Sequence, residues 1–237
     1  MKSLLLWLEG PLQSWGADSR FWNRTTLPFP TRSGVMGLLC CALGRGGEQE
    51  EWLAHMASVP QTVRAYAREK YGRVERQPFL RDFHMIGSGY DQDDPWQSLL
   101  VPKTGEGKKP VGAGANAGAK ITYREYVQDM AFACVLQLPD GEVEELNAAL
   151  EAPVWELSLG RRCCPPSERI GRGVFSSEEE AFGAAEELAA QKGRRLVLTV
   201  RDGSDEECDE VLILNDVPVR FGPRKAYQSR QVSLYLP

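Results

Sequence analysis

The order of the apolar segments, interrupted by one long segment without periodicity, constrains the fold of this chain more than any other feature. Runs typical of buried strands and the three-four spacing typical of helices follow one another as strand, helix, strand, insert, strand, helix, strand. The insert spans residues 87–119 and is rich in Gly, Pro, Asp and Lys. Because this order is that of the split βαβ pattern, an antiparallel sheet with helices on one face, we expect an α+β, ferredoxin-like core.

The segments before the insert predict a strand, a long loop, two helices and a second strand. "SLLLWLE" indicates a buried strand, because it is short and ends at Gly10 and Pro11. After a loop over residues 10–30, a helix begins near Thr31 and ends at Gly44, which suits an αL cap. "EQEEWLAHMASV" predicts a second helix, and the partial alternation of "QTVRAYAREK" predicts a strand.

The segments after the insert complete this pattern and add a C-terminal part. "KITYREYVQDMAFACVLQL" predicts one long strand or two strands joined at Gln128 and Asp129, followed by the helix "GEVEELNAALEAP" and the strand "VWELSLG". Beyond them lie a predicted helix, "EEEAFGAAEELAAQ", and three predicted strands that could form a small second sheet, "RRLVLTV", "DEVLILN" and "VSLYL". We therefore expect a core of residues 1–86 and 120–175, an insert of residues 87–119 and a C-terminal helix and β-rich extension of residues 176–237.

Composition indicates a globular, cytoplasmic protein without a metal or cofactor. The 237 residues are 42% hydrophobic, which supplies a core, and the N-terminal apolar run ends after Leu8, too early for a signal peptide or a membrane span. The six cysteines include two adjacent pairs, neither with the two-residue gap of a zinc knuckle, and the two histidines are far apart. We expect reduced, mostly buried thiols and no metal site.

The charges are separated along the chain, which permits an anionic ligand on an acidic protein. The formal net charge is -5, yet residues 20–45 and 217–237 contain arginine and lysine but no acid, and residues 161–172 hold four arginines against one glutamate. The acids gather in "SSEEEAFGAAEELAA" and "DGSDEECDE". The alternative, that the charges serve only solubility, stays open at this point.

The helix start "FPTRSGVMG" is a candidate anion site. Thr31 or Ser33 can cap the helix, Gly34 lets a ligand approach the backbone, and Arg32 adds a charged fork. The alternative is an ordinary helix cap with a solvated arginine. The acid-free loop just upstream favours a ligand, because its Trp15, Phe21 and Trp22 offer surfaces for base stacking.

No motif for an enzyme stands out. "GAGANAGAK" lacks the Gly-Lys-Ser/Thr ending of a phosphate-binding loop, and "GSG" at 87–89 is not a nucleophile elbow. His84 could act as a general base in RNA cleavage, with Arg81 or Lys120 stabilising the developing charge. It could equally be a hydrogen-bonding residue at the root of the insert.

Several segments together resemble a known family. "LEGPLQSWG", "FPTRSGVMGLLCCALG", "RDFH", "ITYREYVQDMAF" and "LSLGRRCCPPS" resemble, nearly end to end, the Cas-five family of subunits of type I-E Cascade, a CRISPR RNA-guided surveillance complex. The resemblance implies an RRM-related ferredoxin-like core with a β-hairpin thumb inserted near residues 87–119. It also implies that the protein binds the 5′ handle of the CRISPR RNA (crRNA), caps the CasC backbone filament and contacts the large subunit CasA. Target DNA would be met only through the complex, and no membrane is implied.

The resemblance also implies the RNA-contacting residues. Phosphate and 2′-hydroxyl contacts are expected from side chains of the N-terminal loop, the helix start, the thumb root and the "LGRRCCPP" loop: Arg20, Arg24, Thr31, Arg32, Ser33, Arg45, Arg81, His84, Lys120, Thr122, Arg124, Arg161 and Arg162. Tyr123 or Tyr126 would offer a stacking surface. Arg124 and Glu125 are neighbours on a predicted strand and point to opposite faces, so at most one of them faces RNA.

Two other functions compete with this interpretation. Cas-five proteins of type I-C cut precursor RNA without metal, but the adjacent Lys-His pair to look for is absent, because Ile121 follows Lys120. In type I-E systems the separate CasE subunit makes the cut, so we expect a non-catalytic protein here. A filament cap that contacts only protein would leave the arginine-rich loop without a ligand.

Overall fold

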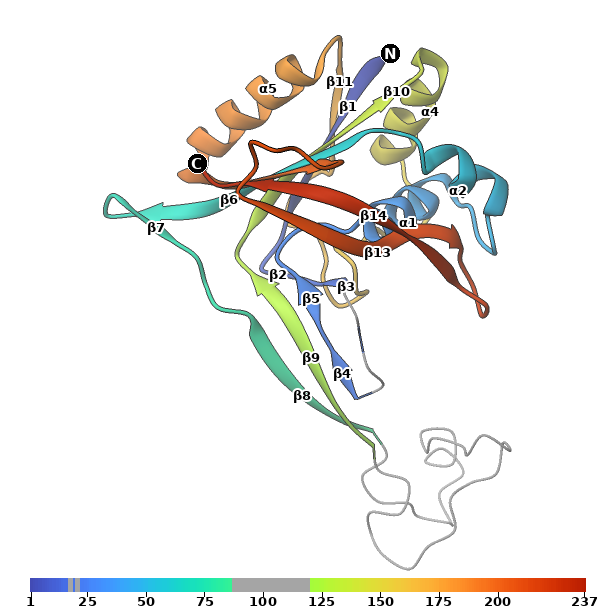
Figure 1. The fold of residues 1–237 in the computed structure, drawn as a ribbon, viewed down its shortest axis with the longest axis horizontal. Helices are drawn as coiled ribbons and strands as arrows, with labels where there is room; N and C mark the ends of the chain where they lie inside the picture. The colour runs from blue at the N-terminus through green and yellow to red at the C-terminus, as the bar shows by residue number, and fades with distance from the viewer. Residues whose placement is uncertain (17–18, 20–21, 87–119) are drawn as a thin grey trace, which may run out of the picture.

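The computed structural model describes residues 1–16, 19, 22–86 and 120–237 (Figure 1). They form an α+β fold with one large sheet and two smaller ones. The large sheet has eight strands in the order β11-β1-β10-β6-β12-β14-β13, with the short β7 paired to β6. Its strands are β1 (Lys2–Glu9), β6 (Gln61–Lys70), β7 (Arg73–Glu75), β10 (Ala131–Leu138), β11 (Gly171–Phe175), β12 (Arg194–Asp202), β13 (Glu210–Arg220) and β14 (Ala226–Tyr235).

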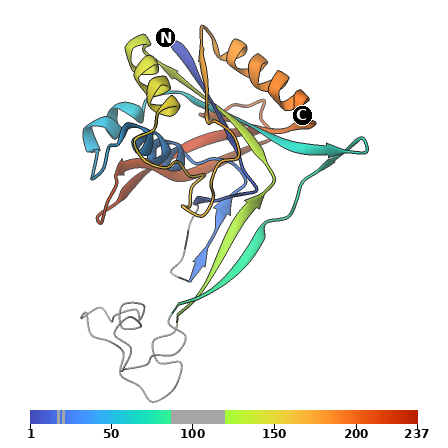
Figure 2. The same ribbon diagram turned by 180° about the vertical axis from the view of Figure 1, so that it is seen from behind.

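Helices cover both faces of this sheet, which explains the continuous apolar run of β1. Alternate residues of β1 belong to two cores: Leu4 and Leu6 face one side, and Leu5 and Trp7 face the other. The first side is covered by α1 (Arg32–Leu43), α2 (Glu50–Met56) and α4 (Asp140–Glu151), and the second by α5 (Glu178–Gln191), as Figures 1 and 2 show. A strand buried on both faces has no polar positions to alternate with.

The predicted order of elements in the core is present, with one strand in a different place. β1, α1, β6, β10, α4 and β11 follow the order strand, helix, strand, strand, helix, strand. The prediction of a strand at "VWELSLG" is wrong: Val154 and Trp155 donate their backbone N–H groups to Ala42 and Cys41, where α1 ends. These two N–H groups bind carbonyls at the end of α1 and are therefore not available to a neighbouring strand. The last strand of the core forms later in the chain, as β11.

The expected small second sheet is also wrong. β12 pairs antiparallel with β6, with Leu198 opposite Ala65, and β14 and β13 then extend the same sheet. Strand β6 buries residues on both faces, so its free edge accepts a further strand rather than facing water. Among the described residues, no helix combines the length and the apolar character needed to cross a membrane.

A hairpin extends away from the large sheet toward the insert. Its strands are β8 (Leu80–Ile86) and β9 (Lys120–Gln128), which we call the arm (Figure 1). Of the two possibilities left by the sequence, β9 and β10 are two separate strands. The short strands β2 (Leu12–Gln13) and β4 (Asn23–Arg24) pair with β9, and β3 (Trp15–Gly16) pairs with β5 (Thr26–Leu27). The thumb expected at residues 87–119 lies outside the described residues.

Arg32 joins the start of α1 to the C-terminal strands. Its side chain is almost completely buried and donates hydrogen bonds to the carbonyls of Met56 (3.1 Å) and Val59 (2.9 Å) and to the Asp202 carboxylate on β12. Arg230 on β14 in turn binds Asp202 and Asp216. The positive and negative side chains of this set alternate, so removing any one of them leaves an opposite charge with one partner fewer in the interior, which is costly.

We expect Arg32→Ala to lower the free energy of unfolding by about 3–5 kcal/mol, because Asp202 loses one of its two arginine partners and the Met56 and Val59 carbonyls lose the guanidinium. Urea unfolding followed by circular dichroism measures this. Arg220→Ala is the control: it breaks a half-exposed pair with Glu50 and should cost less than about 1 kcal/mol. Equal unfolding midpoints for the two variants would contradict a structural role for Arg32.

The six cysteines are free and differ in exposure. Cys40, Cys134 and Cys164 are buried, whereas Cys163 is exposed. Burial raises the pKa of the Cys134 and Cys164 thiols to about 12 and that of Cys40 to about 11. Because the thiolate is the reactive form, these three thiols are chemically protected at neutral pH.

At pH 8, iodoacetamide should therefore alkylate Cys163 in the native protein and leave Cys134 unmodified, as read by peptide mass spectrometry. Both cysteines should react after unfolding in urea, which serves as the control. Alkylation of native Cys134 at the rate of Cys163 would show that the core opens readily.

Candidate nucleic-acid interface

The start of α1 is capped by groups of the protein itself. Thr31 is the N-cap, and its Oγ1 accepts a hydrogen bond from the Gly34 N–H (3.2 Å). The backbone N–H of Arg32 donates to Asp216 Oδ2 (2.7 Å). A carboxylate thus occupies the helix N-terminus, where the sequence suggested a phosphate. The expected anion site at this point is therefore corrected: Asp216, more than 180 residues away in sequence, fills it.

Two other residues of the helix start also have structural roles. The guanidinium of Arg32 is buried and turned toward β12, so it is not available to a ligand. Gly34 was expected to let a ligand approach, but a Cβ there would lie 2.8 Å from Cε3 of Trp15. The missing side chain therefore lets Trp15, itself buried, pack against the helix.

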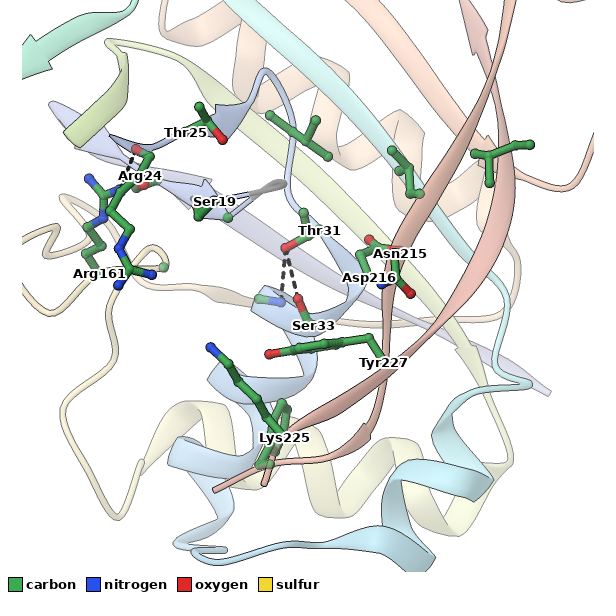
Figure 3. Close-up of a pocket in the computed structure, with 18 residues that line it drawn as sticks. Ser19, Arg24, Thr25, Thr31, Ser33, Arg161, Asn215, Asp216, Lys225 and Tyr227 are labelled. Carbon is green, nitrogen blue, oxygen red and sulfur yellow. Dashed lines mark hydrogen bonds between the residues drawn. The ribbon is translucent and has the colours of Figure 1, made fainter. Parts of the chain in front are cut away.

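A cleft of about 670 Å³ lies beside this helix start (Figure 3). Four parts of the chain line it: the β2–β5 region, the first turn of α1, the loop at Gly160 and the β13–β14 hairpin. Its lining residues are Ser14, Gly16, Ser19, Arg24, Thr25, Leu27, Thr31, Ser33, Gly34, Gly160, Arg161, Ile213, Leu214, Asn215, Asp216, Phe221, Lys225 and Tyr227. The cleft therefore combines hydroxyl and amide groups with three cations and one carboxylate.

Arg161 forms one wall of the cleft and is held in place by its neighbours. Its guanidinium donates to the carbonyls of Glu125 (3.1 Å) and Arg24 (3.0 Å) and lies 4.6 Å from the ring centre of Tyr126. The adjacent Gly160 has a positive φ of 90°, and a Cβ there would lie 1.8 Å from the Ser14 carbonyl oxygen. Only glycine allows this contact, which fixes the loop against β2.

Tyr126 is fixed by the same loop. Besides its contact with Arg161, its hydroxyl lies 3.6 Å from Cys163 Sγ. Burial raises the pKa of this hydroxyl, so it stays neutral at physiological pH. Arg162, the next residue of this loop after Arg161, is exposed.

Lys225 and Tyr227 form the opposite wall and were missed by the site prediction. Figure 3 shows both side chains extending past Ser33 toward the side where Arg24 and Arg161 lie. The acid-free segment 217–237 was the signal that pointed to them. Two further cations of this segment form ion pairs: Arg220 pairs with Glu50, and Arg230 with Asp202 and Asp216.

The arm presents two chemically different faces. Asp82 and His84 of β8 lie opposite Arg124 and Thr122 of β9, and His84 Nε2 is 2.6 Å from Asp82 Oδ2. Arg24 pairs in parallel register with Arg124, so both side chains are expected on this face. Because Arg24 also lines the cleft, the polar face of the arm continues into it.

The other face of the arm is aromatic. Phe83 and Tyr123 have ring centres 5.7 Å apart, and the Arg81 guanidinium lies 4.5 Å from the Tyr123 ring centre. The strand alternation separates Arg81 from Arg124. The arm residues expected to contact RNA therefore do not share one face.

The remaining expected site residues lie elsewhere. Arg45 follows the other end of α1, pairs with Glu145 (3.0 Å) and stacks 5.5 Å from the Trp52 ring centre. A helix of 12 residues is about 18 Å long, so Arg45 is far from the cleft. Lys120 begins β9. Arg20 and Phe21 lie outside the described residues.

A metal centre is not built by the described residues. Within residues 1–16, 19, 22–86 and 120–237, no group of three or more His, Cys, Asp or Glu side chains is placed to hold a metal ion. The cleft and the arm offer hydrogen bonding, positive charge and aromatic stacking.

Comparison with known proteins gives consistent matches over nearly the whole chain. The model of a family described as "CRISPR-associated protein (Cas_Cas5)" matches residues 3–233. The chain is 32% identical over 180 residues to the CRISPR system Cascade subunit CasD of Escherichia coli (strain K12), covering 74% of this chain and 72% of that protein.

Two solved structures are similar to this chain over nearly its whole length. A chain of a CRISPR RNA-guided surveillance complex superimposes with a TM-score of 0.70 and 28% identity, covering 99% of this chain and 89% of the other. A second structure, described as a Cas protein, shares the fold with a TM-score of 0.57 at 22% identity, covering 99% and 94%. On the family match and the 32% identity, this chain belongs to the Cas5 family of CRISPR-associated proteins.

Proposed function

We propose that this protein is a non-catalytic subunit of a Cascade-type CRISPR surveillance complex and that it binds the 5′ handle of the crRNA. The observation that carries the proposal is the cleft at the start of α1, where Arg24, Arg161 and Lys225 come from three separate parts of the chain. Three cations gathered on a protein of net charge -5 favour a local polyanion. The likeness to a chain of an RNA-guided complex favours RNA as that polyanion.

Different lining residues of the cleft would contact different chemical groups of the RNA. The cations Arg24, Arg161 and Lys225 suit phosphates, whereas the buried carboxylate of Asp216 is already paired with Arg230 and the Arg32 N–H. Neighbouring Asn215 and Ser33 offer hydrogen bonds to a base edge or a 2′-hydroxyl, and Tyr227 offers a stacking surface. A volume of about 670 Å³ falls in the range of pockets that hold small ligands and suits a nucleotide.

The rest of the fold is compatible with this role. The order β11-β1-β10-β6, with α1 and α4 as crossovers, supports a ferredoxin-like, RRM-related core. The arm would be the base of the thumb, continued by residues 87–119. Its face bearing His84, Thr122 and Arg124 would extend the RNA path beyond the cleft.

Assembly with other proteins is part of the same proposal. Val154, Trp155 and Ile213 are large apolar residues with 63%, 46% and 73% of their surface exposed, which suits contact with partner subunits. We infer that the protein caps the backbone filament of CasC and contacts CasA, and that it meets target DNA only through the complex. The cytoplasmic location stays a prediction.

Lys225→Ala and Arg24→Ala should each weaken binding to a labelled handle RNA and lower the slope of log K against log salt by about one, because each removes one phosphate contact. Fluorescence anisotropy across a salt series measures both quantities. Arg45→Ala is the matched control and should change neither, since Arg45 lies at the far end of α1. If Arg45→Ala weakens binding and Lys225→Ala does not, the cleft is not the RNA site.

Asn215→Ala should act differently from the cation variants. It leaves the number of charges unchanged, so the salt slope should stay at the wild-type value while discrimination between handle sequences declines. Competition with handle RNAs carrying single base changes measures that discrimination. Weaker binding with unchanged discrimination would mean that Asn215 contacts the RNA backbone and not a base edge.

A metal-independent endoribonuclease is the second candidate, favoured by the contact between His84 and Asp82, because a carboxylate can orient a histidine base. Incubation with precursor repeat RNA in the presence of a chelator tests it. We expect binding without cleavage for the wild type. Cleavage that His84→Ala abolishes would establish the enzyme and overturn the non-catalytic proposal.

A further inference from the structure

We propose that Asp129, held by Arg194 and Arg68, is a positioning residue that sets the angle between the arm and the large sheet. The consequence for RNA binding rests on the proposed function, but the angle itself belongs to the free protein. The argument starts from the path of two neighbouring strands.

Both strands that connect the arm to the sheet change direction at the same level. Strands β1 and β10 pair up to Glu9 and Ala131, and β2 and β9 pair from Leu12 and Gln128. Between these two ladders lie Gly10 and Pro11 on one chain segment and Asp129 and Met130 on the other. We call this place the bend. The regular ladder is interrupted there, and the backbone hydrogen bond from Asp129 to Pro11 leaves the direction of the ribbon to be fixed with the help of side chains.

Gln13 fixes the inner side of the bend. It is completely buried, and its Nε2 donates to the carbonyls of Met130 (2.7 Å) and Leu8 (3.2 Å), one on each strand. Its Oε1 accepts from Trp15 Nε1 (3.2 Å). This amide therefore links the two strands of the ribbon to the region that lines the cleft.

Asp129 occupies the outer side and has an unusual backbone conformation. Its φ is +48°, in the left-handed region that non-glycine residues rarely adopt, although Asp and Asn tolerate it best. Its N–H donates to the Pro11 carbonyl (3.1 Å) across the bend. The chain therefore turns at this residue, and other groups must hold it there.

Two arginines of the large sheet hold Asp129. Arg194 Nη1 donates to its carbonyl oxygen (2.8 Å) and Nη2 to its Oδ1 (3.2 Å), while Arg68 Nε is 2.8 Å from Oδ2. The two arginines are register partners on β12 and β6. The bend is thus bound to strands that do not belong to the arm.

Arg194 also reaches the other strand of the ribbon. Its Nη2 lies 2.8 Å from Oε1 of Glu9, the last residue of β1, and only 2% of its side chain is exposed. Burial alone would raise the pKa of Glu9, but hydrogen bonds from Trp7 Nε1 and Arg194 keep it below its usual value. Glu9 therefore stays charged, and one guanidinium joins both strands at the bend.

A small change of angle at the bend would be amplified along the arm. Strand β9 has nine residues and is about 30 Å long, so a rotation of about 10° moves its far end by about 5 Å. His84, on the outer part of the arm, would move with it relative to Lys225 in the cleft, whereas Arg161 is bound to β9 itself near the bend. A fixed angle keeps the two parts of the proposed RNA path in register.

Double electron–electron resonance measures this angle directly, without RNA. Ketone-linked spin labels at Ile121 on the arm and Glu187 on α5, both exposed, avoid labelling the native cysteines. Asp129→Asn keeps the size and the tolerance for positive φ, but removes the charge that both arginines bind and sets an N–H donor against one of the two guanidinium groups. We expect the distance distribution to shift or broaden by several ångströms.

Arg195→Gln is the matched control, because it removes the neighbouring arginine of β12, whose exposed pair with Glu69 does not involve the bend. The control should keep the wild-type distribution. An unchanged distribution in folded Asp129→Asn would overturn the proposal. If that variant does not fold, Arg68→Gln, which removes only the half-exposed contact to Oδ2, decides in the same way.

This experiment and the RNA-binding assays can fail independently. A shifted distance with Lys225→Ala binding RNA normally would keep the positioning role and reject the cleft as RNA site. An unchanged distance with weakened Lys225→Ala binding would reject the positioning role alone.

Discussion

A buried guanidinium determines where the cleft can form. Arg32 binds Asp202 and the carbonyls that follow α2, and through Asp202 and Arg230 it is connected to Asp216. Asp216 in turn caps the N–H of Arg32. This closed set of opposite charges fixes the start of α1 against β12, β13 and β14, because leaving any one member unpaired in the interior is costly. The first turn of α1 and the β13–β14 hairpin, which this set of charges holds together, line the cleft.

The same arrangement separates the charges of an acidic protein in space. The acidic helix α5 covers the face of the sheet opposite to α1, so its carboxylates lie away from the cleft (Figure 2). Near the cleft, Asp216 is balanced by Arg230, which leaves Arg24, Arg161 and Lys225 to determine the local charge. The cations of the cleft and the acids of α5 therefore lie on different sides of the sheet.

Particular residues show how far the sequence alone could go toward the site. Two acid-free segments and one arginine-rich segment pointed to the regions of Arg24, Lys225 and Arg161, and these regions do meet around one cleft. The same reasoning gave Arg32 to a ligand, although the structure buries it. Composition cannot separate these cases, because an arginine that binds a phosphate and one that binds a buried carboxylate share the same chemistry. The deciding partner, Asp202, is 170 residues away.

The sequence by itself determined the local elements: β1 from its apolar run, α1 from its cap and spacing, and the separation of the core by a long insert. It also carried the family resemblance. Only the tertiary structure decided that the C-terminal strands join the same sheet, that Asp216 occupies the helix N-terminus, and that Asp129 adopts a positive φ between Arg194 and Arg68 where the ladder is interrupted. The physical reason is that helix and strand signals act over a few residues, whereas strand pairing and buried ion pairs join residues far apart in the chain.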